Sequence, residues 1–431
     1  MDDTQLLLDD LARQHQVPGA VLAFHDGTRT HEYATGVLNT ATGVPTTTDS
    51  LFQIGSITKV WTATLVLQLV EEGRVRLDQP VREVLPEFRV ADPDATAAIT
   101  VRQLLTHTSG IDGDHFVDTG RGDGCVERYV ATCADVTQIH PPGATLSYCN
   151  SGYVVLGRLV EHLTGRTWDA ALRERLIEPL RLTHTVTLPE EALLFRAAVG
   201  HLDGRPAPVW APPRSAGPAG LICARAADVV AFGRWQLEKG PAAMRVPQAE
   251  IPEHGNTGSW GLGWMLDTWD GREVIGHSGA TIGQYARLYA VPDAGVVACL
   301  VTNGGQSAAF QQAVFTALFA DVCDLRVRPR PEPPTAPPTV DLETHVGVYE
   351  RAGARLTFTL ADGTLSLLSE TTGALAELSP SVRVEEIVPV GDGAFLGRYP
   401  GDPLWFAITF YPLPDGTPAV HAGMRATPKV R

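Results

Sequence analysis

Residues 51–61 read LFQIGSITKVW, and the rest of the chain is interpreted around them. An apolar, β-prone run leads to Ser56, and Lys59 follows three residues later. The next run, Val60–Val70, is apolar without Gly or Pro and ends at Glu-Glu-Gly, which is typical of a helix and its stop. Ser56 is therefore expected where the helix begins, with Lys59 one turn further along the same face.

This arrangement suits a nucleophile. The Ser56 hydroxyl would stand at the positive end of the helix dipole, with its own backbone N–H directed at an oxyanion and the Lys59 amine within reach of its proton. The same pattern also fits a helix cap, with Ser56 as the N-cap and Lys59 as a solvated first-turn residue. Ser-x-x-Lys is a common sequence, so the choice between the two depends on the rest of the chain.

The composition is that of an acidic globular protein. The chain has 431 residues, of which 44% are hydrophobic and 19% charged, and its length corresponds to about two or three domains. A formal net charge of -15 argues against nucleic acid and anionic membrane surfaces as partners. The N-terminus lacks the basic and apolar regions of a signal peptide, and no run reaches transmembrane length. We therefore expect a cytoplasmic protein, or a secreted one if a signal was removed.

Cysteine and histidine spacing indicates neither a metal site nor a disulfide framework. The six cysteines include no C-x-x-C pair, and Cys299 and Cys323 lie in apolar runs typical of the core. The thirteen histidines include no H-E-x-x-H, and no phosphate-binding loop is present. We expect no metal and no cofactor.

The periodicity of the apolar residues predicts strands at both ends of a region and helices between them. Helices are expected over residues 2–16, 60–70, 99–110, 126–133, 150–163, 166–186, 227–237 and 308–322. Strands are expected over residues 20–25, 30–36, 273–277, 284–291 and 295–302. This order indicates a sheet assembled from remote segments with an inserted helical lobe, and a cleft between two lobes is a favoured place for a site.

The C-terminal part has a different character. Residues 326–338 are rich in proline and predict a semi-rigid linker. Beyond them, short β-runs alternate with Asp-Gly turns up to Arg425, which predicts a small antiparallel β-barrel. We therefore divide the chain into residues 1–325, a linker over 326–340 and a β-domain over 341–431.

Two further fragments carry side chains suited to the same chemistry. Tyr148 and Asn150 precede the second long helix and face one side of an extended segment, while Cys149 points into the core. His277–Gly279 ends a predicted strand, where Gly lets a substrate approach and the N–H of Ala280 faces a bound carbonyl. Each fragment alone also fits a structural role, as a buried phenol, a helix cap or a surface strand residue. Together, and in this order, they favour a catalytic site.

The three fragments resemble those of the serine β-lactamase and penicillin-binding-protein superfamily, in particular its class C-like branch with D-aminopeptidases, D,D-carboxypeptidases and family VIII esterases. Ser56–Lys59 matches the Ser-x-x-Lys of that group, Tyr148–Asn150 its Tyr-x-Asn, and His277–Gly279 its Lys/His-x-Gly position. Leu104–Gly110 (LLTHTSG) and Gly261–Trp264 (GLGW) also resemble stretches common in the branch. The resemblance covers roughly residues 5–325. The tail resembles the lipocalin-like β-barrel appended to some members.

The resemblance implies an α+β fold, in which an antiparallel sheet flanked by helices and an all-α lobe enclose the site and a small antiparallel β-barrel follows. Ser56 Oγ would attack a carbonyl and form an acyl-enzyme, and the N–H groups of Ser56 and Ala280 would hold the oxyanion. Lys59 and Tyr148 would share the role of base. Asn150 would hold Lys59 or the substrate amide in register, and His277 and Gly279 would position the substrate.

Two roles for Lys59 fit the sequence equally. As a neutral base near neutral pH it needs a pKa about three units below that of a free lysine, which burial can supply. Alternatively Lys59 stays charged and lowers the pKa of Tyr148.

His277 departs from the Lys that many lactamases carry at this position. Histidine is mostly neutral at neutral pH, so a carboxylate-bearing β-lactam should be held less strongly. We therefore expect hydrolysis of an ester or a short peptide, including one with a D-residue. Acyl transfer to an amine, as in peptide cyclases, weak β-lactamase activity and a non-catalytic binding or sensing role are the alternatives. The C-terminal barrel would narrow substrate choice or support a homo-oligomer.

Overall fold

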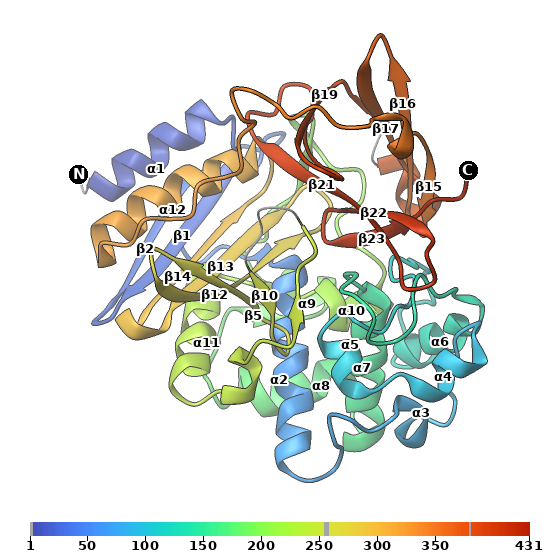
Figure 1. Cartoon of the computed structure of the whole chain (residues 1–431). Coiled ribbons are helices and arrows are strands. Elements are labelled where there is room, and N and C mark those ends of the chain that lie inside the picture. The colour runs from blue at the N-terminus through green and yellow to red at the C-terminus, as the bar shows by residue number, and fades with distance from the viewer. Residues whose placement is uncertain (1–2, 254–257, 379–380) are drawn as a thin grey trace.

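A nine-stranded antiparallel sheet forms the framework of the computed structural model, which describes residues 3–253, 258–378 and 381–431 (Figure 1). Its strand order is β3-β2-β1-β14-β13-β12-β11-β10-β9, so strands from the two ends of the region pair in its centre. The strands are β1 (Gly19–Asp26), β2 (Thr30–Asn39), β3 (Val44–Pro45), β9 (Ala249–Glu250), β10 (Ser259–Trp260), β11 (Met265–Trp269), β12 (Arg272–Ala280), β13 (Tyr285–Val291) and β14 (Val296–Thr302). The predicted sheet from remote segments is confirmed.

Both faces of this sheet are buried, and the period-two pattern of β1 explains how. Ala20 and Leu22 belong to a core beneath α1 (Asp3–Gln14) and α12 (Ser307–Cys323), whereas Val21 and Ala23 belong to the larger core on the opposite face. Figure 1 shows α1 and α12 side by side on one face of the sheet and α11 (Ala226–Glu238) on the other.

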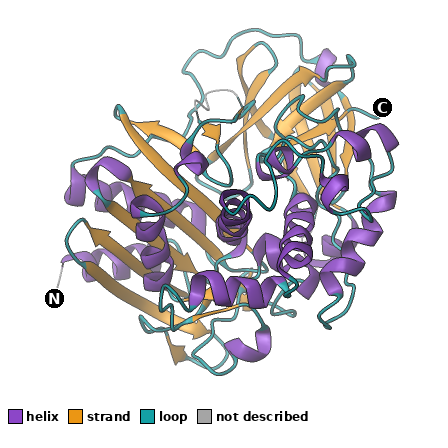
Figure 2. Ribbon diagram, turned by 90° about the horizontal axis from the view of Figure 1, so that it is seen from below, coloured by secondary structure: helices purple, strands orange, loops and turns teal. Residues whose placement is uncertain are grey.

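The larger core continues into a helical lobe. Its centre is α2 (Thr58–Glu71), which packs against α7 (Asn150–Thr164). The remaining helices of this region are α3 (Val81–Val84), α4 (Pro93–Ala98), α5 (Val101–Leu105), α6 (Cys125–Thr132), α8 (Trp168–Leu172), α9 (Pro189–Ala192) and α10 (Gly217–Gly220). Figure 2 shows helices on both sides of the large sheet and the lobe beside it.

Short strands tie the lobe to the sheet region. A small antiparallel sheet has the strand order β4-β8-β5, and β6 pairs with β7. These strands are β4 (Phe52–Gln53), β5 (Thr185–Val186), β6 (His201–Leu202), β7 (Arg205–Pro206) and β8 (Cys223–Ala224). Every helix among the described residues is too short or too polar to span a bilayer.

Two helices end earlier than the sequence predicts. Helix α5 ends at Leu105, not at Gly110, because His107 adopts a positive φ of 58° and its Nδ1 accepts the N–H of Cys149. In residues 166–186, α8 passes into a π-helical turn over Arg173–Ile177, and the end of that stretch is strand β5. Contacts with distant residues decide where both helices end, and such contacts cannot be predicted from the local periodicity of the sequence.

The C-terminal region is all-β, as predicted, but its described residues form two sheets and no closed barrel. Both are antiparallel, and they meet where Tyr349 bridges to Lys429. The first sheet contains β15 (Gly347–Arg351), β16 (Ala354–Ala361), β17 (Thr364–Thr371) and β18 (Val382–Val384). The second contains β19 (Glu386–Gly391), β20 (Ala394–Arg398), β21 (Trp405–Pro412), β22 (Pro418–Ala422) and β23 (Arg425–Pro428).

Residues 324–342, before these sheets, contain neither helix nor strand. The lipocalin-like character of the region, the domain boundaries and a role in homo-oligomerisation stay predictions.

Candidate active site

Ser56 lies in a 3-10 turn, η1 (Gly55–Ile57), between β4 and α2. Helix α2 begins two residues later, so Ser56 is at the entry to the helix and not in its first turn. Gly55 has a φ of +52°, and a Cβ there would lie 2.5 Å from the backbone N of Ala280. Only glycine fits this conformation and this approach.

The end of β12 packs directly on the Ser56 turn. A Cβ on Gly279 would overlap the carbonyl oxygen of Ile54 and would lie 3.0 Å from the backbone N of Ser56. The two glycines therefore let the backbones of Ser56 and Ala280 approach each other. This is the arrangement that two oxyanion-holding N–H groups require.

Lys59 is fully buried, and its ammonium nitrogen touches three oxygens. Its Nζ lies 3.0 Å from Ser56 Oγ, 2.8 Å from Asn150 Oδ1 and 2.6 Å from the Ala219 carbonyl oxygen. Burial and the Arg425 charge hold the pKa of Lys59 well below its ordinary value. If the amine is neutral, its two N–H groups satisfy Asn150 and Ala219 and its lone pair is left for the Ser56 proton.

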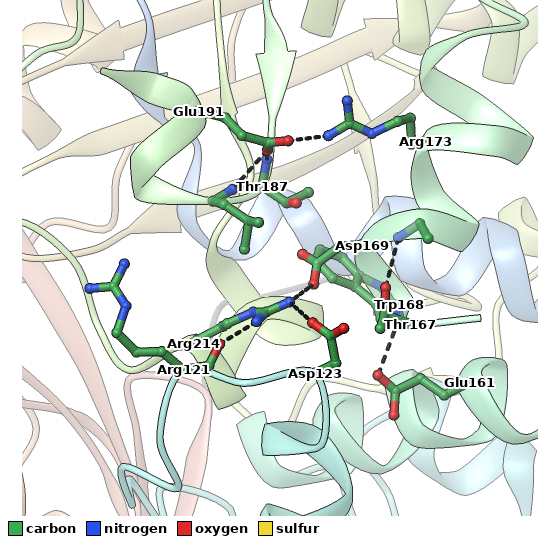
Figure 3. Close-up of polar contacts among 12 residues, drawn as sticks. Arg121, Asp123, Glu161, Thr167, Trp168, Asp169, Arg173, Thr187, Glu191 and Arg214 are labelled. Atoms are coloured by element: carbon green, nitrogen blue, oxygen red, sulfur yellow. Dashed lines mark hydrogen bonds and ion pairs between the residues drawn. The ribbon is translucent and has the colours of Figure 1, made fainter. Parts of the chain in front are cut away.

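The Ala219 carbonyl is held in place by the packing of α10. Thr62 Oγ1 donates to the Pro218 carbonyl at 2.7 Å. Just before α10, the largely buried Arg214 forms ion pairs with Asp169 and Asp123 (Figure 3). These contacts fix the segment that carries the third Lys59 acceptor.

Tyr148 covers the same amine. Its ring centroid lies 4.8 Å from Lys59 Nζ on one side and 4.9 Å from the Arg425 guanidinium carbon on another. Burial raises the pKa of the Tyr148 phenol, although the nearby Ser56 side chain and the Arg425 charge oppose this. The ring also stacks on His107, 4.2 Å between centroids.

His277 lies beside the Tyr148 ring as a neutral residue. It is buried, and its Nδ1 lies 2.6 Å from the Ser278 carbonyl oxygen, which therefore accepts an Nδ1–H. Burial, aided by the Lys59 charge, lowers the pKa of His277 to about 3. His277 is thus uncharged at neutral pH, as the sequence predicts, and brings no positive charge for a substrate carboxylate.

The structure brings all of the predicted site residues together. The sequence reasoning missed three groups that contact them, the Ala219 carbonyl, Asp114 and Arg425. It also missed Arg351, which contacts Asp114. Asp114 lies in a loop and Arg425 is 311 positions further along the chain, and no local pattern distinguishes either.

The two additional stretches noted in the sequence, Leu104–Gly110 and Gly261–Trp264, contact the elements that carry site residues. In the first, the ring of His107 holds the N–H of Cys149 at 3.0 Å, which fixes the extended segment that carries Tyr148. In the second, Gly263 has a φ of +94° and a Cβ there would lie 2.7 Å from the side chain of Ala63 in α2. Both stretches therefore position elements that carry site residues.

Comparison with known proteins places the chain in a family. The Beta-lactamase family matches residues 5–321. Penicillin-binding protein 4 of Amycolatopsis lactamdurans is 49% identical over 367 residues, which cover 80% of this chain and 96% of that protein.

Solved structures extend the similarity. SurE with D-Leu has a TM-score of 0.78 and 29% identity, and the match covers 100% of this chain and 99% of that one. The D-amino acid amidase from Ochrobactrum anthropi SV3, complexed with L-phenylalanine amide, has a TM-score of 0.62 and 26% identity over 73% of this chain and 97% of its own. With a family match over most of its length and a relative that is 49% identical over 80% of the chain, the chain belongs to the Beta-lactamase family.

Proposed function

We propose that this protein is a serine hydrolase that cleaves an ester or a short peptide through an acyl-enzyme on Ser56. One observation carries the proposal: the buried Lys59 amine lies 3.0 Å from Ser56 Oγ, while two fixed oxygens, from Asn150 and Ala219, take its remaining hydrogen bonds. This geometry directs the lone pair of the Lys59 amine at Ser56 Oγ, the nucleophile, whose proton it can accept.

Acylation follows from these contacts. Neutral Lys59 takes the Ser56 proton as Oγ attacks the substrate carbonyl carbon. The resulting oxyanion is held by the N–H groups of Ser56 and Ala280. When the tetrahedral intermediate collapses, the leaving alcohol or amine takes a proton from the Tyr148 hydroxyl, which Lys59 reprotonates.

Deacylation uses the same groups in reverse. Water attacks the acyl carbonyl and gives its proton to the base formed by Tyr148 and Lys59. The acid product then leaves and Ser56 regains its proton, so no cofactor enters the balance.

The similar proteins support a substrate that carries a D-residue. One solved structure holds D-Leu and another is a D-amino acid amidase. Because His277 is neutral, we propose a substrate whose binding needs no carboxylate beside that residue.

A panel of acyl donors tests the proposal. Intact mass and product formation are followed for a nitrophenyl ester, amides of D- and L-phenylalanine, a fluorophosphonate and a penicillin, with Ser56→Ala as the matched control. We expect one adduct per chain with the fluorophosphonate, turnover of the ester and of the D-amide ahead of the L-amide, and a long-lived adduct with the penicillin. No adduct and no turnover in any arm refutes the proposal, and product that contains an added amine in place of water identifies a transferase.

His277→Gln is expected to lower kcat/KM for the ester by about 10-fold, a far smaller loss than that of Ser56→Ala. Since the pKa of His277 is about 3, its protonation does not shape the rate between about pH 5 and about pH 8. The variant should therefore keep the pH profile of the wild type at a reduced height. A limb of the profile that disappears in His277→Gln contradicts this assignment.

A further inference from the structure

The orientation of the Asn150 side-chain amide is set by its two hydrogen-bond partners. Its Oδ1 accepts from Lys59, and its Nδ2 donates to Asp114 Oδ1 at 2.7 Å. An ionised carboxylate only accepts hydrogen bonds, so the NH2 end of the Asn150 amide must face Asp114. The oxygen end then necessarily faces Lys59.

Asp114 is ionised because the C-terminal sheets supply two positive charges. Its side chain is only 9% exposed, and burial alone would raise its pKa. Arg351 lies 2.7 Å from Asp114 Oδ2, and Arg425 Nε lies 2.6 Å from the same oxygen. The two guanidinium groups outweigh burial and hold the pKa of Asp114 below its ordinary value.

The fold delivers these arginines from opposite ends of the C-terminal region. Arg351 ends β15 and Arg425 begins β23, the first and last strands of the two sheets. The Val348 N–H of β15 donates at 2.9 Å to the carbonyl of Arg431, in the segment that follows β23. Next to them, the Tyr148 N–H donates to the Met424 carbonyl at 2.8 Å, so the same strand end also holds the site segment.

We infer that Asp114 is a positioning residue for the proposed reaction: held ionised by Arg351 and Arg425, it fixes the Asn150 amide and thereby directs the Lys59 lone pair at Ser56. The inference rests on the proposed function. It makes the C-terminal sheets part of the reaction machinery, since the charge that orients the amide is stable only in their presence.

The charges of this cluster also act on the base. One carboxylate and two guanidinium groups carry a net positive charge, which disfavours an ammonium on Lys59. The titratable and charged groups that face Lys59 from the surrounding elements are Tyr148, Cys149, Tyr153, His107, His277, Asp114 and Arg425. Of these, Arg425 lowers the pKa of Lys59, and Asp114 raises it.

Asp114→Asn tests the inference in the full-length chain. The new side-chain amide has the same shape as the carboxylate it replaces, but it no longer prevents the Asn150 amide from flipping. We expect acylation by a nitrophenyl ester to slow by about 100-fold, with KM little changed. The ascending limb of kcat/KM should move to lower pH, since a negative charge beside the base is lost. Arg425→Gln should move the limb to higher pH, since a positive charge is lost. Both directions hold whether Lys59 or Tyr148 is the base, because Asp114 and Arg425 act on both pKa values with the same signs.

Asp112→Asn is the matched control. Asp112 Oδ2 accepts the Ala352 N–H at 2.7 Å, so it joins the same two parts of the chain without contacting Asn150. This variant should keep the wild-type acylation rate and limb. The inference is overturned if both Asp→Asn variants lose the same acylation rate and the ascending limb of kcat/KM does not shift. It is also overturned if Asp114→Asn acylates at the wild-type rate. Either result leaves the proposed function intact. If Asp114→Asn does not fold, Arg425→Gln decides, and an unmoved limb overturns the inference. A wild-type chain that forms no adduct overturns both.

Discussion

Ser56→Ala should lower kcat for any acyl donor by about 10⁶-fold, and the residual rate should stay above that of the reaction without enzyme because the oxyanion-holding N–H groups remain. No neighbouring group can replace its Oγ as the nucleophile, because Lys59 is fully buried and Tyr148 has its pKa raised by burial. Stopped-flow and long-time assays of a nitrophenyl ester measure the loss. Intact mass should show no adduct on the variant.

The same variant should keep its fold and its affinity for substrate. The Ser56 side chain donates to no main-chain group that defines the turn, whose shape depends on Gly55 and on the packing of β12. An unchanged Tm together with an unchanged Kd for a slowly cleaved D-amide would separate chemistry from binding. An adduct that persists in Ser56→Ala would place the nucleophile elsewhere.

Local pattern predicted the part of the site that lies on single elements. The three-residue spacing of Ser56 and Lys59 puts both on one side of a helix entry, and the extended run before α7 puts Tyr148 and Asn150 on one side of a strand-like segment. These relations depend only on backbone geometry a few residues long. They hold in the structure, with Lys59 Nζ in contact with both Ser56 and Asn150.

Groups that reach the site through tertiary packing were not predictable in this way. Ala219 contacts Lys59 through its backbone carbonyl, and the residue type at position 219 gives no sign of this contact. The position of the carbonyl depends on the packing of α10. Asp114 and Arg425 meet only because the C-terminal sheets dock beside the site. The sequence predicted a small antiparallel β-barrel, and the described strands form two antiparallel sheets. Alternating β-runs specify antiparallel strands, but not which strands pair at the edges.

Lys59→Met should lower the acylation rate constant by about 10⁴-fold, since the variant lacks the group that takes the Ser56 proton. Its stability should respond in the opposite direction. The folded-state pKa of Lys59 lies well below that of the unfolded chain, so the unfolded state binds more protons at neutral pH and the buried amine lowers the free energy of unfolding there. The difference in Tm, variant minus wild type, should therefore be larger at about pH 7 than at about pH 9. A variant that acylates within tenfold of the wild-type rate contradicts the role of base.

Tyr148→Phe, compared with Lys59→Met, decides which of the two groups is the base. A nitrophenolate leaves without a proton, whereas an amine must be protonated to leave. If Lys59 is the base and Tyr148 passes its proton to the leaving group, Lys59→Met slows ester and amide alike, and Tyr148→Phe slows the amide far more than the ester. If Tyr148 is the base, Tyr148→Phe removes both activities together with the ascending limb. The two fixed acceptors of Lys59, with Ser56 as its third contact, favour the first result.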